Sequence, residues 1–201
     1  MGNITNQMKE ELQLLFYALY DGLRQEVRQR KLTQLATGED FSIVGEREVG
    51  LASLLALHLR SVGFMVQLDA YFYGDSKRRP DFGIWLPASR EYIYLEFKQT
   101  AWGKDSKQCY YAKAIEDIEK LNRETDPRNQ RNGLIALGFS DPRKRKEQLW
   151  EGFKKFLSER ITRDYPYYKE IGLEAVDFQG MDKQTSYAVV GLWFRTEWND
   201  K

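Results

Sequence analysis

Two acidic residues and a lysine, all within residues 81–98, are the side chains of this chain best suited, by kind and by spacing, to a chemical role. Asp81 follows Pro80, and farther along Glu96 and Lys98 end a run of β-branched and aromatic residues. Neighbouring carboxylate oxygens suit Mg²⁺ or Mn²⁺, which take oxygen ligands and keep several waters. Such an ion lowers the pKa of a bound water, and a nearby lysine stabilises charge on a phosphate in the transition state. If they converge, these side chains have the chemistry to cut a phosphodiester.

The spacing predicts that they do converge. Residues 92–98 alternate in polarity as a strand does, so Glu96 and Lys98 lie on one face and Phe97 on the other. Asp81 opens a second apolar run at 82–86, and residues 87–90 have the composition of a hairpin connection. Antiparallel pairing of the two runs brings Asp81 beside Glu96.

Pro80-Asp81 and Glu96-Phe97-Lys98, with Gln99 directly after, resemble the signature of the PD-(D/E)XK nuclease superfamily, which includes restriction endonucleases, Holliday-junction resolvases and RecB-type exonucleases. The resemblance implies an α/β protein with a restriction-endonuclease-like mixed central β-sheet flanked by helices. It implies a metal-dependent nuclease in which Asp81 and Glu96 bind Mg²⁺, with Mn²⁺ as a substitute, Lys98 positions the attacking water and Gln99 orients the site. DNA is the expected substrate, while RNA, and endonuclease or exonuclease action, stay open.

A third acid is expected on the preceding helix, predicted at 45–61. Glu48 shares a stripe with Leu51, Ala52, Leu55 and Leu59, and a buried acid is costly unless it is paired or bound to metal. The superfamily carries a glutamate next to the metal on this helix, so the resemblance implies that role for Glu48. Glu46 is the alternative. A helix-start glutamate favoured by the helix dipole would explain Glu48 equally well.

Several cations are candidate nucleic-acid contacts. One cluster of cations lies in a polar loop just before Pro80, and another lies at the start of a helix predicted at 141–160. A further lysine lies on a helix predicted at 106–122. The candidates are Lys77, Arg78, Arg79, Lys113, Arg143 and Lys144. Solvated surface charge is the alternative explanation, and for Lys113 it is pairing with Glu116 and Asp117.

The chain is predicted to form a single domain, residues 1–201. Residues 1–36 form a helical extension, 45–140 the catalytic core, and 141–201 a helix with closing strands. The helix at 6–35 is amphipathic and packs either on the core or on a second subunit, which would make a homodimer. Strands are predicted at 64–72, 133–139, 174–178 and 187–194.

Composition narrows the function classes. A chain of 201 residues that is 42% hydrophobic suits one α/β domain, and a net charge of +1 means that nucleic-acid affinity must come from local patches. Cys109 is the single cysteine, and no apolar run has transmembrane length, so we expect a cytoplasmic protein without a membrane partner. His58 is the only histidine, which disfavours catalytic triads and histidine zinc sites.

Two competing hypotheses remain. The first is a catalytically silent member of the nuclease fold that binds nucleic acid or a protein partner. The second is an unrelated α/β binding protein in which Glu96 and Lys98 form only an ion pair on a solvated face.

Overall fold

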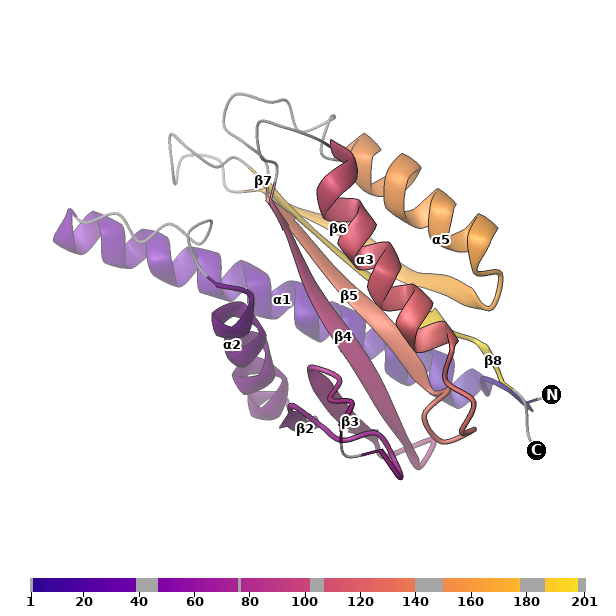
Figure 1. The fold of residues 1–201 in the computed structure, drawn as a ribbon. Helices are drawn as coiled ribbons and strands as arrows, with labels where there is room; N and C mark the ends of the chain where they lie inside the picture. Colours follow the sequence, from indigo (N-terminus) through magenta and orange to yellow (C-terminus); the bar gives the residue numbers. More distant parts are fainter. Residues whose placement is uncertain are drawn as a thin grey trace.

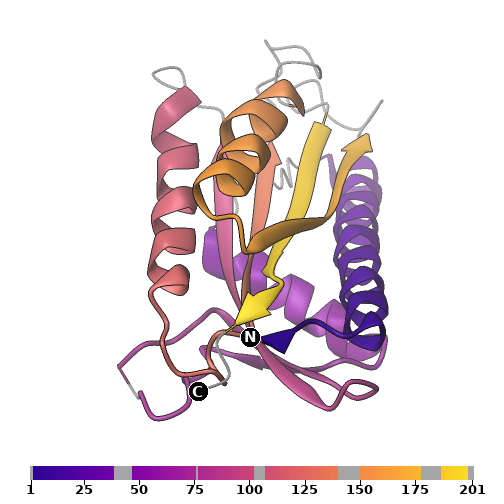
Figure 2. The ribbon, with the colours of Figure 1, turned by 90° about the vertical axis from the view of Figure 1, so that its right-hand side faces the viewer.

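A computed structural model gives the protein three layers, with a mixed β-sheet between two layers of helices (Figure 1). The structure describes residues 2–38, 47–75, 77–101, 107–139, 150–177 and 187–198. Helices α1 (Asn6–Thr37) and α2 (Glu48–Ser61) cover one face of the sheet. Helices α3 (Lys107–Asn122) and α5 (Glu159–Asp164) cover the other, as the rotated view in Figure 2 also shows.

Six strands make up the central sheet, in the order β2-β3-β4-β5-β7-β6. Neighbouring strands pair antiparallel except β4 and β5, which are parallel and are connected through α3. Strand β5 is buried along its whole length, as a strand covered on both faces should be. The strands are β2 (Met65–Leu68), β3 (Phe82–Leu86), β4 (Glu91–Ala101), β5 (Asn132–Phe139), β6 (Tyr168–Asp177) and β7 (Tyr187–Arg195).

The long N-terminal helix packs on this chain's own sheet. Its apolar side, which includes Leu12, Leu19 and Leu23, joins one core with α2 and the sheet. Where α1 meets α2, a Cβ on Gly22 would lie only 2.6 Å from Cδ2 of His58, so the close approach requires glycine. The prediction that the helix packs on the core is therefore confirmed, and the homodimer stays a prediction. Within the described residues, no helix combines the length and apolar character needed to cross a bilayer.

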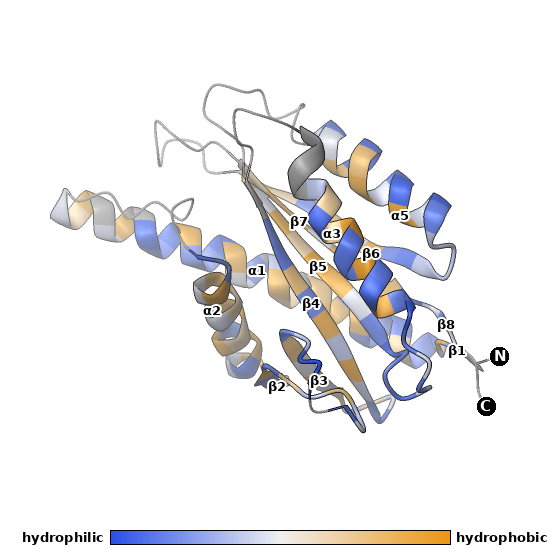
Figure 3. Cartoon of the chain, in the orientation of Figure 1, coloured by the Kyte–Doolittle hydropathy of each residue, from blue (hydrophilic) through white to orange (hydrophobic). Residues whose placement is uncertain are grey.

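A second core lies on the opposite face, under α3 and α5. Ile115 and Ile118 of α3 pack there with Leu157, which belongs to η2 (Phe153–Ser158), a π-helical segment leading into α5. Hydrophobic and hydrophilic residues alternate along these helices in Figure 3, as expected for helices with one buried side. Alternation along β4 sends Ile93, Leu95 and Phe97 into the first core and Tyr94 into the second, as predicted.

Some boundaries differ from those expected. Strand β2 ends at Leu68 and does not extend to residue 72, because Asp69 adopts a left-handed conformation with φ 47°. Strand β6 begins at Tyr168, well before residue 174, and its register shifts between Glu170 and Gly172. A small pairing of β1 (Gly2–Asn3) with β8 (Glu197–Trp198) was not predicted. Residues 45–46 and 141–149 of the expected helices lie outside the described residues.

Candidate functional site

The candidate site forms where β4 runs on past the start of β3. The last pair of the two strands is Phe82 with Leu95, and beyond it no strand among the described residues pairs with β4 on that side. Two carboxylates take the place of the missing strand. The backbone N–H of Phe97 donates to Asp81 Oδ2 (2.7 Å), and that of Gln99 donates to Glu48 Oε2 (2.9 Å). Asp81 and Glu48 are therefore fixed by the backbone of the same strand that carries Glu96 and Lys98.

Asp81 and Glu96 form a close carboxyl pair. The pKa of Glu96 is raised to about 8. Burial is the largest cause, followed by the negative charge of Asp81 and a hydrogen bond to it. Burial also raises the pKa of Asp81, although the N–H of Phe97 opposes this shift. The Glu96 carboxyl thus holds a proton at neutral pH and donates it to the Asp81 carboxylate. The predicted convergence of these two side chains is confirmed.

Lys98 lies between two other acids. Its Nζ is 3.0 Å from Glu48 Oε1 and 3.3 Å from Asp117 Oδ2, and its side chain is 21% exposed. Burial lowers the pKa of Lys98, but the charges and hydrogen bonds of Asp117 and Glu48 outweigh this, so its pKa lies above the ordinary value. Lys98 is therefore a fixed cation and not a base. Its two partners also argue against the hypothesis of a simple Glu96–Lys98 ion pair on a solvated face.

Asp117 is the site residue that sequence reasoning missed. It is 8% exposed, on the side of α3 that buries Ala114, Ile118 and Leu121, and it bonds Lys98 and Lys120 (Oδ1 to Nζ, 2.8 Å). An acid on an apolar helical stripe was the signal that singled out Glu48, and the same signal was present here. The sequence predicted that Asp117 pairs with Lys113, but the ion pairs of Asp117 within the described chain are with Lys98 and Lys120. These two lysines occupy both carboxylate oxygens.

The donor set suits a hard cation held by few protein atoms. Within the described ranges, no group of three or more His, Cys, Asp or Glu side chains is placed to hold a metal. Asp81 and Glu96 supply two adjacent carboxyls, whereas both oxygens of Glu48 bond to Lys98 and Gln99. Mg²⁺ is commonly bound by one or two carboxylates with waters and substrate phosphates completing its shell, so the pair fits that ion. A metal-ligand role for Glu48 stays a prediction, and Glu46 lies outside the described residues.

The other predicted site residues differ in where they lie and in what they contact. Gln99 contributes its backbone N–H to Glu48. Arg78 is paired with Glu124 and also donates to the Lys120 carbonyl, which leaves it little freedom to bind phosphate. Lys77, Arg79 and Lys113 are exposed, while Arg143 and Lys144 lie outside the described residues.

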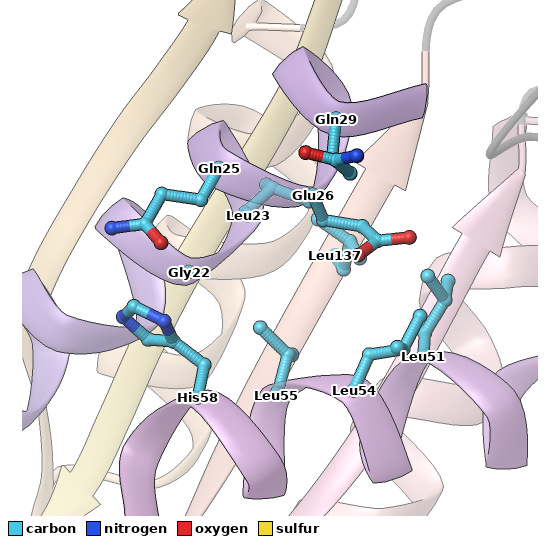
Figure 4. Close-up of a pocket in the computed structure, with 10 residues that line it drawn as sticks. All are labelled: Gly22, Leu23, Gln25, Glu26, Gln29, Leu51, Leu54, Leu55, His58 and Leu137. Atoms are coloured by element: carbon cyan, nitrogen blue, oxygen red, sulfur yellow. The ribbon is translucent and has the colours of Figure 1, made fainter. Parts of the chain in front are cut away.

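A cavity of about 250 Å³ lies elsewhere, between α1 and α2 (Figure 4). Gln25, Glu26 and Gln29 of α1 face leucines of α2 across it, and His58 closes one end. The Nε2 atom of His58 is buried without a hydrogen bond, 3.9 Å from Asp21 Oδ2. None of the carboxylates around Lys98 lines this cavity, so the two features are separate.

Comparison of the chain with protein-family models, with curated proteins and with solved structures gave no match. The class of protein therefore has to be argued from the fold and the site alone.

Proposed function

We propose that the chain is a metal-dependent nuclease of the PD-(D/E)XK type, with a restriction-endonuclease-like fold and DNA as its substrate. The observation that carries the proposal is the contact between the Asp81 and Glu96 carboxyls, with the charge of Lys98, two residues along β4 from Glu96, acting on both. Unpaired buried acids are costly, so two of them in contact need a compensating cation or a shared proton.

The order of elements supports the proposal. An acid-bearing helix (α2) precedes the first core strand, β3 and β4 form the hairpin that carries the signature residues, and a helix and a parallel strand follow. This is the arrangement that the resemblance implies for the superfamily. Asp81 directly precedes β3, and Glu96 lies one residue beyond the last pair of the hairpin, Phe82 with Leu95, so the fold itself explains why they meet.

Each residue then has a chemical role. Asp81 and Glu96 would hold Mg²⁺, which when bound supplies an activated water and neutralises charge on the phosphate. Lys98, kept protonated by Glu48 and Asp117, presents an ammonium to the water and the phosphate oxygens. Glu48 and Gln99 position Lys98 and the strand end. Glu96 must lose its proton before it can bind the metal.

The test is cleavage of plasmid, linear and single-stranded DNA at several Mg²⁺ and Mn²⁺ concentrations. Asp81→Ala and Lys98→Ala should each abolish a metal-dependent activity, while Glu174→Ala, on an exposed position of β6, should keep it. Cleavage that survives both site substitutions would come from a contaminant and would remove the proposal. An RNA substrate run in parallel decides between the two nucleic acids.

A catalytically silent module is the second candidate, and one observation favours it. Asp81 and Glu48 complete the hydrogen bonding of β4, so both would be retained for stability without any catalysis. A protein that binds nucleic acid but cleaves none of the substrates with either metal would support this candidate over the enzyme.

A further inference from the structure

Two exposed tyrosines lie on the loop that leads into Asp81. Tyr71 is 46% and Tyr73 is 55% exposed, although aromatic side chains are usually buried. A guanidinium covers each ring: Arg79 lies 4.4 Å from the centroid of Tyr71, and Arg128 lies over Tyr73. Asp126 neutralises Arg128 through two hydrogen bonds. Arg79 makes no ion pair with any described residue, so the Tyr71–Arg79 stack keeps its positive charge.

Backbone hydrogen bonds fix this stack close to the carboxyl pair. The N–H of Asp69 donates to the Asp81 carbonyl (3.1 Å), and that of Phe72 donates to the Arg78 carbonyl (3.4 Å). The two sides of the loop therefore run side by side, with Tyr71 across from Arg79, and Arg79 is two residues from Asp81. Two residues of extended chain span about 7 Å, which is about two nucleotide steps along one stacked strand.

The loop that carries Tyr71 is also held in place by contacts of the next two residues, Phe72 and Tyr73. Phe72 is buried and packs edge-on against Tyr94 of β4, with ring centroids 4.8 Å apart. The side chain of Asn129 both accepts from the N–H of Tyr73 (2.7 Å) and donates to its carbonyl (3.2 Å). Because the backbone is held on both sides of Tyr71, little conformational freedom is lost when its ring takes up a partner.

We propose that Tyr71 and Arg79 form a stacking site for an unpaired base of single-stranded DNA, about two nucleotides from the phosphate that meets Asp81 and Glu96. The inference rests on the proposed function and names its substrate class. Every base has a face that stacks on an aromatic ring, but in a duplex that face is covered by the neighbouring base pairs. The charge of Arg79 attracts the adjoining phosphate. A protein with a net charge of +1 has no global field to hold nucleic acid, so stacking supplies the affinity.

The experiment is a binding titration in chelator, where no metal-dependent cleavage occurs. Fluorescence anisotropy of a labelled single-stranded DNA oligonucleotide is compared with that of its duplex and with a series in which one nucleotide at a time is abasic. Tyr71→Ala should weaken single-strand binding about 5- to 150-fold, the range of one stacked base, whereas Tyr71→Trp should preserve it. Tyr17→Ala removes a ring from α1 that is even more exposed, at 60%, and should change nothing.

The abasic series separates stacking from a structural effect. At the nucleotide whose base stacks on Tyr71, the abasic substitution should weaken binding to the wild type by the same factor as Tyr71→Ala does. The same abasic substitution should not weaken binding to Tyr71→Ala any further. Thermal melting of each variant verifies that it is folded.

The two proposals fail in different ways. If Tyr71→Ala binds single strands as the wild type does, or if the wild type binds duplex as tightly or binds no oligonucleotide, the stacking site is overturned whatever the cleavage assay gives. If binding depends on Tyr71 but no metal supports cleavage, the stacking site is upheld and the nuclease proposal fails.

Discussion

Glu96 is the residue whose protonation links the site to the stability of the protein. Its pKa rises from 4.5 to about 8 on folding, mainly through burial and the neighbouring Asp81. Between these pH values the native carboxyl keeps a proton that the unfolded chain has lost. The contribution of Glu96 to the free energy of unfolding of the metal-free protein should therefore fall as the pH rises from about 4.5 to about 8, by on the order of 5 kcal/mol, and change no further above.

Glu96→Gln tests this dependence, because the amide mimics the protonated carboxyl. Denaturant unfolding in chelator, repeated between pH 5 and pH 9, should show a flatter profile for the variant and greater stability than the wild type at pH 9. Glu174→Gln, at an exposed position of β6, should follow the wild type. Parallel profiles for Glu96→Gln and the wild type would mean that Glu96 is ionised at neutral pH.

At the scale of elements, two amides on the unpaired edge of β4, those of Phe97 and Gln99, each depend on one carboxylate side chain. Asp81→Ala leaves the N–H of Phe97 without its acceptor, and Glu48→Ala does the same for Gln99. Each change should cost about 1 to 2 kcal/mol, and the isosteric Asp81→Asn and Glu48→Gln should cost less because an amide oxygen still accepts the bond.

Amide hydrogen exchange followed by NMR resolves the two effects. Asp81→Ala should speed exchange at Phe97 more than at Gln99, and Glu48→Ala should do the reverse. The amide of Tyr94 bonds to the Arg131 carbonyl on the other side of β4 and is the internal reference. Equal acceleration at Phe97 and Gln99 in both variants would indicate general loosening of the strand end and contradict the assignment.

The crossing of α1 and α2 gives a prediction whose size changes with the partner residue. Alanine is favoured over glycine by up to about 1 kcal/mol inside a helix, but a Cβ on Gly22 would lie 2.6 Å from the His58 ring. Overpacking of this kind costs about 1 to 3 kcal/mol, so Gly22→Ala should destabilise the protein. In the His58→Ala background the ring is gone and only the Cβ of residue 58 stays close, at 3.2 Å, so Gly22→Ala should destabilise the protein much less. Urea unfolding of the four proteins gives the double-mutant cycle, and equal destabilisation in both backgrounds would contradict the contact.

For the molecule as a whole, sequence periodicity predicted the individual helices and the β3–β4 hairpin, and the resemblance implied the α/β class with flanking helices. Periodicity also predicted the Asp81–Glu96 contact, because hairpin pairing and strand alternation are local rules. What it missed depends on long-range packing. Asp117 meets Lys98 only because α3 docks on β4, and β6 extends to Tyr168 because it pairs with β7. The Tyr71–Arg79 stack depends on two backbone bonds across a loop that no periodicity describes.

Metal binding should be visible in the stability of the whole domain. A cation held by Asp81 and Glu96 binds the native state only, so at about 100 times its dissociation constant it adds about 2.7 kcal/mol to the free energy of unfolding. For a domain of this size, that raises the Tm by about 5 to 10 °C. Because the ion must displace the proton of Glu96, the shift at a fixed Mg²⁺ concentration should be larger at pH 8.5 than at pH 6.5. Calorimetry with Mg²⁺, then with excess chelator, should show the rise and its reversal in the wild type and in Glu174→Gln, but not in Asp81→Asn. A rise that persists in Asp81→Asn would place the ion at another site.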